Sequence, residues 1–209
     1  MSAAAAVAPQ GRRRVDGERE HEILSAALAV LAEVGYDRLT MDAVAARARA
    51  SKATLYRRWN GKVELVIDAL LTLKQPPESP DTGTLRGDLL AAACSTGGLT
   101  EDTLAPMAGV LTALVSDEEF ATAFRREVIA PRTDLTRQAF ERARERGELR
   151  DGVDLDLLAP ALAALVLHRL YVLGTPPDET VLTALIDQII LPAALAAPAV
   201  AARQPRGTS

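Results

Sequence analysis

The stretch that decides the fold is Leu39–Lys62, which reads LTMDAVAARARASKATLYRRWNGK. It predicts two short helices, Met41–Ala48 and Lys52–Trp59, separated by a tight turn. Thr40 and Ser51 stand just before them as N-caps, because a hydroxyl oxygen can accept a hydrogen bond from the free N–H groups of a first turn. Two short helices with such a turn have the dimensions of a helix-turn-helix, whose second helix enters the major groove of DNA.

Apolar residues at helical spacing indicate which faces of these helices are buried. Val44 and Ala45 of the first helix can pack on Leu55 and Trp59 of the second, so we predict Trp59 as a core residue. A preceding helix, predicted over Arg19–Glu33, would close this core from behind. The side chains that remain for the outer face of the second helix are Lys52, Thr54, Tyr56, Arg57 and Arg58.

The charge of the chain is unevenly distributed. The formal net charge is -4, from 24 Lys and Arg against 28 Asp and Glu. Within Arg38–Lys62, however, seven basic residues stand against Asp42 alone. A local basic field matters more for binding a polyanion than the global charge does. From charge alone, a solvated basic face remains the alternative to a DNA-binding surface.

The rest of the chain predicts helices and no strand, because its apolar residues are mostly Ala, Leu and Val at helical spacing. Gly35 is expected to end the first helix, and Pro131 to break or kink a helix that starts at a Ser116/Glu119 capping box. The other predicted helices cover about residues 62–74, 85–95, 106–115, 154–173 and 178–196.

These elements define the expected fold class and domains. We expect an all-α protein of about nine helices, with an N-terminal three-helix helix-turn-helix domain followed by a C-terminal helical bundle. The predicted segments are a disordered basic tail (1–17), a helix-turn-helix DNA-binding domain (18–74), a ligand-binding and dimerisation domain (84–197) and a disordered tail (198–209). Prolines 76, 77 and 80 mark the linker between the two domains.

Composition argues against several other classes of protein. A single cysteine, Cys94, allows no intramolecular disulfide, and two histidines leave few ways to build a catalytic triad or a metal site. There is no glycine-rich phosphate loop. We therefore expect no enzyme, no metal and no cofactor. The N-terminus lacks a signal-peptide pattern, and the most apolar stretch, Leu155–Leu167, falls short of the roughly 20 residues of a membrane span. We expect a cytoplasmic protein that does not enter a membrane.

The N-terminal quarter resembles the DNA-binding domain of the tetracycline-repressor (TetR) family. The residues that carry the resemblance are Ile23-Leu24, Ala27, Gly35-Tyr36, Leu39-Thr40-Met41, Val44-Ala45, Ser51-Lys52-Ala53-Thr54-Leu55-Tyr56, Trp59, Lys62 and Leu65. Arg49 and Ala53 depart from the family pattern, which often has Gly at both places, and Arg58-Trp59 replaces a frequent His-Phe. If the Arg49 site needs a left-handed backbone, arginine costs about 1 kcal/mol there.

The resemblance implies a homodimer that binds a palindromic operator in double-stranded DNA and is released by a small molecule. Repression is expected, and the helices over 155–173 and 181–195 are expected to form the dimer interface. Arg57 is the candidate for a bidentate contact to guanine, while Tyr56 would place its hydroxyl on a phosphate and its ring on the core. The full set of DNA-binding candidates is Thr40, Arg49, Ser51, Lys52, Thr54, Tyr56, Arg57, Arg58 and Lys62.

Three points stay open at this stage. Arg12–Arg14 is either an arm that reaches the minor groove or an ordinary basic tail. An all-helical small-molecule-binding or scaffolding protein without sequence-specific DNA binding is the alternative function. The candidate residues of a pocket for an apolar or amphipathic effector are Met107, Leu111, Leu114, Phe120, Phe124, His168 and Tyr171. Each of them is also compatible with plain core packing, and His168 with a packed or interfacial position.

Overall fold

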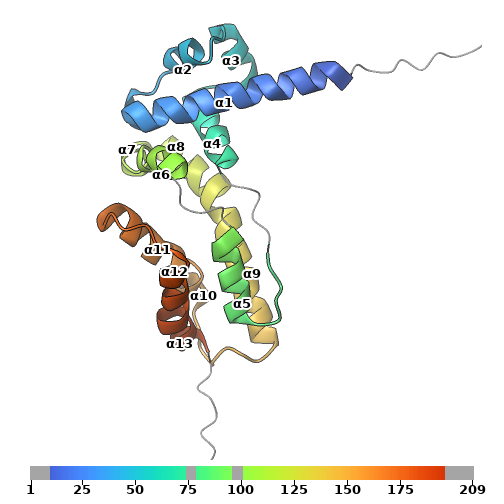
Figure 1. Ribbon diagram of the computed structural model, residues 1–209, viewed down its shortest axis with the longest axis vertical. Coiled ribbons are helices and arrows are strands. Elements are labelled where there is room, and N and C mark those ends of the chain that lie inside the picture. The colour runs from blue at the N-terminus through green and yellow to red at the C-terminus, as the bar shows by residue number, and fades with distance from the viewer. Residues whose placement is uncertain (1–9, 74–78, 96–100, 196–209) are drawn as a thin grey trace, which may run out of the picture. The chain divides into compact units, whose positions relative to one another are not determined.

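The computed structural model describes residues 10–73, 79–95 and 101–195, and these residues form helices and one isolated β-bridge, Leu149–Leu195 (Figure 1). The chain divides into two compact units, residues 1–75 with 99–131 and residues 76–98 with 132–209. The predicted domains, 18–74 and 84–197, divide it differently. The difference is residues 99–131, which pack with the N-terminal helices.

The helices of the first unit surround α1 (Gln10–Arg38). In Figure 1, α2 and α3 lie on one side of α1, and α4, α6 and α8 lie on the other. Helix α1 packs directly against α2, α4 and α6. The bounds of the other elements in this unit are α2 Met41–Arg47, α3 Lys52–Arg58, α4 Lys62–Thr72, α6 Glu101–Ala108, α7 Ala113–Ser116, α8 Glu118–Phe124 and the π-helical turn η1 Arg125–Ile129.

Helix α1 corrects one prediction and confirms another. The prediction of a disordered tail over 1–17 is wrong from Gln10 onward, because α1 begins there, directly after Pro9. Residues 1–9 of this predicted tail, and the other predicted tail, 198–209, lie outside the described residues. At the other end Gly35 takes φ 74° and ψ 168°, which interrupts the helix as expected of a glycine stop.

Tyr36, which follows that stop, is the centre of the first unit's core. Its ring is fully buried and lies 4.2 Å from the ring of Phe120, measured between centroids. Its hydroxyl donates to the Asp117 carboxylate at 3.2 Å, and its backbone N–H donates to the carbonyl of Gly109 at 2.9 Å. Burial raises the pKa of Tyr36 well above its usual range, and the nearby carboxylate adds to the shift.

Two predicted helices of this region were wrong in their limits. The helix predicted over 106–115 is instead α6 and α7, because Pro106 lies inside α6 and the chain leaves the helix at Gly109. The helix from 116 begins one residue later, since Asp117 rather than Ser116 caps α8 by accepting from the N–H of Phe120 at 2.9 Å.

Pro131 does not break the chain's helical course. Helix α8 passes through η1 directly into α9 (Ala130–Glu145), which contains this proline. A proline ring collides with the carbonyl four residues earlier in an α-helix. That carbonyl belongs to Glu127, which lies in the wider π-helical turn, where Ala130 donates to Arg125 five residues back. The π turn thus accommodates the proline without ending the helix.

The second unit is built from α5, most of α9 and the C-terminal helices. Helix α5 (Leu85–Ser95) has the predicted bounds, and it packs against the C-terminal helices around buried Leu85, Leu89, Phe140 and Ile186. The remaining bounds are α10 Leu155–Leu158, α11 Ala161–Leu167, η2 His168–Val172, α12 Glu179–Leu185, η3 Ile186–Ile190 and α13 Leu191–Ala194.

A buried carboxylate joins the start of α5 to α9. Asp88 is fully buried and accepts from the backbone N–H of Thr82 at 2.6 Å and from Arg142 at 3.3 Å. Burial alone would raise the pKa of Asp88, but the hydrogen bonds from Thr82 and Arg142 outweigh it and lower the pKa. Arg142 also donates to the carbonyl of Pro80, so the segment before α5 is held on α9.

The close approach at Gly109 generates a prediction about stability. A Cβ at this position would lie 2.7 Å from the carbonyl oxygen of Leu31 and 3.2 Å from that of Pro106, both backbone atoms that cannot move aside cheaply. We expect Gly109→Ala to lower the free energy of unfolding by about 2 kcal/mol in urea denaturation. Gly17→Ala is the matched control, because nothing lies near that helical position, and it should be neutral or stabilising by up to about 1 kcal/mol. Equal effects of the two changes would contradict this account.

Candidate nucleic-acid interface

The two short helices begin at the predicted residues, and each ends one residue before its predicted limit, at Arg47 and Arg58. Thr40 caps α2, its hydroxyl accepting from the N–H of Ala43 at 3.1 Å, and Ser51 caps α3 in the same way from Thr54 at 3.1 Å. Leu55 and Trp59 are buried, which confirms Trp59 as a core residue. These contacts fix which face of α3 is turned outward.

The turn between the helices contains a strained residue. Among the described residues, Arg49 is the one non-glycine residue in the left-handed region, with φ 51°. A left-handed conformation costs an L-residue with a Cβ about 1 kcal/mol or more. The turn is held by the N–H of Ala50, which donates to the carbonyl of Ala45 at 2.9 Å, and by Arg19 of α1, whose guanidinium donates to the carbonyl of Arg49 at 2.8 Å.

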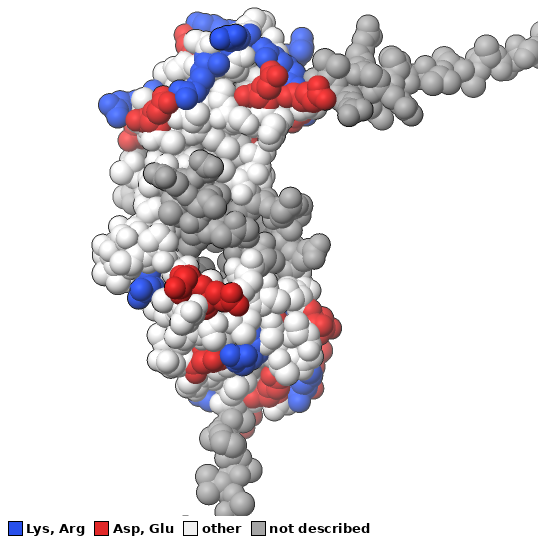
Figure 2. Space-filling model, viewed as in Figure 1, with Lys and Arg blue, Asp and Glu red and all other residues white. Residues whose placement is uncertain are grey.

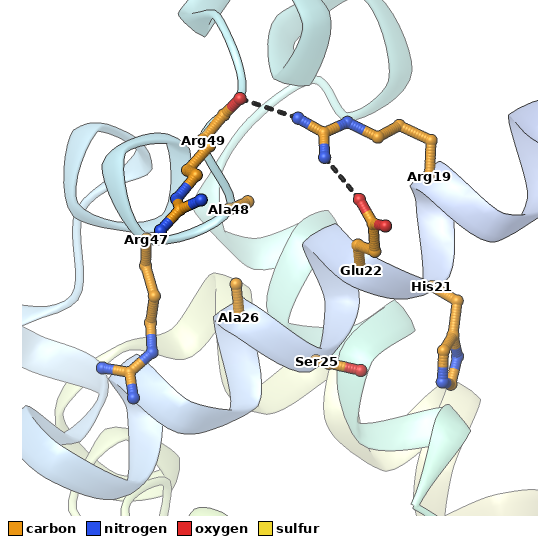
Figure 3. Close-up of a pocket in the computed structure, with 8 residues that line it drawn as sticks. All are labelled: Arg19, His21, Glu22, Ser25, Ala26, Arg47, Ala48 and Arg49. Atoms are coloured by element: carbon orange, nitrogen blue, oxygen red, sulfur yellow. Dashed lines mark hydrogen bonds and ion pairs between the residues drawn. The ribbon is translucent and has the colours of Figure 1, made fainter.

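Figure 3 shows this region from the side of α1. The Arg19 side chain reaches from α1 to the turn and also pairs with Glu22, while His21 points away from it. A pocket of about 550 Å³ lies between α1 and the end of α2, lined by charged and small side chains: Arg19, His21, Glu22, Ser25, Ala26, Arg47, Ala48 and Arg49. Arg19 was not predicted as a site residue, because its contact depends on how α1 packs and not on any local pattern.

The outward side chains of α3 differ in their partners. Arg57 is exposed and forms no ion pair with any described residue. Lys52 pairs with Asp42 of α2 at 2.6 Å, and Arg58 pairs with Glu20 of α1. Thr54 is half-buried, and its hydroxyl lies 2.8 Å from that of Ser51.

The structure corrects the expected position of one aromatic ring. Tyr56 was predicted to rest its ring on the core, but the residue is 56 % exposed. Leu55 of α3 and Trp59, the C-cap residue, point inward, and Tyr56 lies about 100° around the helix from Leu55, at the edge of the inward face. More than half of Tyr56 is therefore turned to solvent.

Lys62, at the start of α4, has a partner inside the protein. Its ammonium lies 3.9 Å from the centroid of the Tyr36 ring and donates to the Tyr36 carbonyl at 3.3 Å. A cation over an aromatic face is attracted by the ring quadrupole. Lys62 thus joins α4 to the end of α1, and its predicted phosphate contact stays a prediction.

The candidate pocket residues fall into both units. Phe120 and Phe124 are buried in the core of the first unit, with Met107 and Leu114 half-buried against that core and Leu111 exposed. His168 and Tyr171 lie in η2 of the second unit, where His168 is exposed and burial raises the pKa of Tyr171. Their role in binding a ligand stays a prediction. The described residues contain no group of three His, Cys, Asp or Glu side chains placed to hold a metal.

The second unit exposes much of its C-terminal apolar surface. Leu157 is 73 % exposed and Val172 is 69 % exposed. By length and composition alone, Leu155–Val172 is long and apolar enough to cross a membrane, and about 17 % of this stretch is buried. This corrects the expectation that the most apolar stretch ends at Leu167 and is too short for a membrane span. The helical course continues through η2, beyond the last residue of the apolar run that the sequence picks out.

A capped pair of short helices with a basic outer face, held on a longer helix, defines a helix-turn-helix DNA-binding regulator. Comparison with known proteins gives its family. The family model "Bacterial regulatory proteins, tetR family" matches residues 23–69, and the model "Tetracyclin repressor-like, C-terminal domain" matches residues 79–189. The chain belongs to the TetR family of transcriptional regulators. This family consists of regulators and not enzymes, which confirms that expectation.

Individual relatives agree with this assignment. The chain is 38 % identical over 178 residues to the DNA-binding transcriptional repressor TetR of Mycobacteroides abscessus, covering 83 % of this chain and 92 % of the relative. It is 34 % identical to the HTH-type transcriptional regulator AqdR of Rhodococcus erythropolis, covering 78 % and 80 %. Among solved structures, the TetR family transcription regulator SCO0332 matches with a TM-score of 0.64 and 31 % identity, covering 87 % of this chain and all of that one.

The strained turn generates a prediction. We expect Arg49→Gly to raise the free energy of unfolding by about 1 kcal/mol, because glycine adopts a left-handed φ without a steric penalty. Arg47→Gly, in the last turn of α2, is the matched control and should lower it by about 1 kcal/mol, since glycine is a poor helix former. Urea denaturation of both variants measures the difference. Destabilisation by Arg49→Gly would contradict this account and would show that the Arg49 side chain itself supports the turn.

Proposed function

We propose that this protein is a ligand-responsive repressor that binds a palindromic operator as a homodimer through α3. The observation that carries the proposal is the outer face of α3, where Arg57 is exposed and has no ion-pair partner among the described residues, while Leu55 and Trp59 fix the helix on the core. A bidentate guanidinium is the commonest specific reader of guanine in the major groove.

Symmetry supplies the second part of the proposal. Two α3 helices read successive major grooves when they are about 34–36 Å apart, which requires a dimer. The exposed apolar side chains of the helical stretches 155–173 and 181–195 support these as the dimer interface. A contiguous exposed apolar surface is a mark of an interaction site, and helices of this composition form four-helix interfaces. Burial between two subunits, and not in a membrane, fits a DNA-binding protein of the cytoplasm.

Release by a small molecule is the third part. An effector, apolar or amphipathic, would bind in the C-terminal bundle and favour a dimer with a different separation of the two α3 helices, with a coupling of about 1–3 kcal/mol. The solved structure of SmeT supports this kind of function. It is described as the repressor of the Stenotrophomonas maltophilia multidrug efflux pump SmeDEF, and it matches with a TM-score of 0.60 and 26 % identity, covering 85 % of this chain and 90 % of SmeT.

Base reading is tested by Arg57→Ala. The operator is first selected from random DNA with the purified protein, and affinities for it and for single-base variants are then measured by gel shift. We expect a loss of about 1–3 kcal/mol on the selected site and a relaxed preference at the base pairs that Arg57 reads. Arg125→Ala, an exposed arginine of η1, is the matched control and should keep the preference. Failure of the wild type to select any sequence would favour a binding or scaffolding protein instead.

The dimer interface is tested by adding charge to the apolar surface. Leu157→Glu with Val172→Glu should convert a dimer into a monomer in sedimentation, because two carboxylates per subunit would have to lose their hydration to be buried. Val115→Glu is the matched control, since Val115 is 92 % exposed and lies in the first unit. An unchanged sedimentation coefficient in the double variant would place the interface elsewhere.

A further inference from the structure

Helix α3 is fixed at its C-terminal end by a contact with α4. Trp59, the C-cap residue of α3, is buried, and its indole N–H donates to the Asp68 carboxylate of α4 at 2.8 Å. Leu55 holds the middle of the helix on the core. In a helix-turn-helix, the residues that contact base edges lie at the other end, the N-terminal end of the second helix. The position of that end therefore matters most for recognition.

The N-terminal end of α3 is held through the turn that precedes it. Arg49 lies two residues before the N-cap Ser51, and its carbonyl accepts a hydrogen bond from the Arg19 guanidinium of α1 at 2.8 Å. The other terminal nitrogen of Arg19 pairs with Glu22, so the guanidinium is directed at the turn, as Figure 3 shows. A side chain of α1 thus contacts the backbone that leads into α3.

Arg49 has a backbone conformation that is unfavourable for an arginine. Its φ of 51° lies in the left-handed region, where the Cβ comes too close to the following carbonyl oxygen. Within the turn, the N–H of Ala50 donates to the carbonyl of Ala45 at 2.9 Å. A locally unfavourable conformation persists only when the surrounding structure imposes it, and the hydrogen bond from Arg19 does so from outside the helix pair.

We propose that Arg19 is a positioning residue for DNA recognition, which holds the strained turn at Arg49 and so fixes the N-terminal end of α3 for base reading. The proposal rests on the proposed function, because it gives α1 a part in reading the operator. Without this hydrogen bond the turn also populates other conformations. The apparent affinity for the operator then falls in proportion to the fraction of molecules that keep the competent one.

Binding to arbitrary DNA should depend much less on Arg19. Such binding comes from phosphate contacts by several cations and does not require base reading. Lys and Arg side chains gather over the surface that carries α2 and α3, with Asp and Glu side chains next to them (Figure 2). Loss of the hydrogen bond from Arg19 therefore lowers affinity for the operator and leaves most of the affinity for other DNA.

The first test compares Arg19→Gln with Arg125→Gln in the full chain, on the selected operator and on a scrambled duplex of equal length, over a series of salt concentrations. Arg125 pairs with Glu118, so its change removes the same charge away from α3. We expect Arg19→Gln to weaken operator binding about tenfold more than Arg125→Gln does, because one hydrogen bond is lost in each of two subunits. The two variants should bind the scrambled duplex alike.

The salt dependence separates positioning from direct contact. If Arg19 acts only through the turn, both variants should show the same salt dependence on the operator. Loss of a phosphate contact in each subunit would instead flatten the log–log slope by about 1.8. Far-UV circular dichroism of both variants checks that the affinities are those of folded protein.

Replacement of the strained residue provides a rescue experiment. Glycine adopts a positive φ about as readily as a negative one, so Arg49→Gly supports the left-handed turn without help from α1. With Arg49→Gly in place, Arg19→Gln should weaken operator binding by less than about threefold. The two affinities are compared in the same background, so any contact of the Arg49 side chain with DNA cancels.

Hydrogen exchange reports on the turn without DNA. The N–H of Ala50 should exchange about tenfold faster in Arg19→Gln than in the wild type, and Arg125→Gln should leave it unchanged. Equal operator affinities of the two variants, a flattened salt slope, a loss that persists with Arg49→Gly, or unchanged exchange at Ala50 would each overturn the proposal. Failure of the wild type to select any operator would instead overturn the proposed function, and exchange at Ala50 would still decide whether Arg19 holds the turn.

Discussion

The hydrogen bond from the N–H of Tyr36 to the carbonyl of Gly109 is the constraint on which the DNA-binding unit depends. Helices α2 and α3 have seven residues each, which is too short to be stable in isolation. They need a core, and the core needs more than α1 and α4. The buried ring of Tyr36 packs on Phe120, which follows the linker in the chain. Gly109, which has no side chain, lets its backbone approach that of α1 closely enough for the hydrogen bond to form.

One consequence concerns the candidate pocket residues. Phe120 and Phe124 belong to the same core as Leu55 of α3 and Trp59, the C-cap residue of that helix. Close-packed cores transmit a displacement because their side chains have little free volume. A ligand that moved either phenylalanine would therefore act on the unit that carries α3 directly, with no need for a signal to cross an interface between two separately packed bodies.

Features of the fold that depend on residues close together in the chain could be predicted from the sequence. The caps at Thr40 and Ser51, the stop at Gly35 and the bounds of α5 all follow from the chemistry of single residues beside their neighbours in the chain. The passage of the helix through Pro131 could not be predicted in this way, because it depends on a π turn that no residue type marks. The pairing of Glu20 with Arg58 depends on how α1 lies against α3. Phe120 shows a third limit, since the same aromatic side chain suits a packed core and a ligand pocket.

The acidic balance of the chain takes on a different meaning once these pairs are located. A net charge of -4 argues against binding a polyanion only if charge acts as a total. At an ionic strength near that of cells, charges on an exposed surface act over roughly 8 Å, so the potential at α3 is set by its neighbours. Those neighbours include Glu20 and Asp42, which pair with Arg58 and Lys52 of α3, while Arg57 of the same helix forms no ion pair with any described residue.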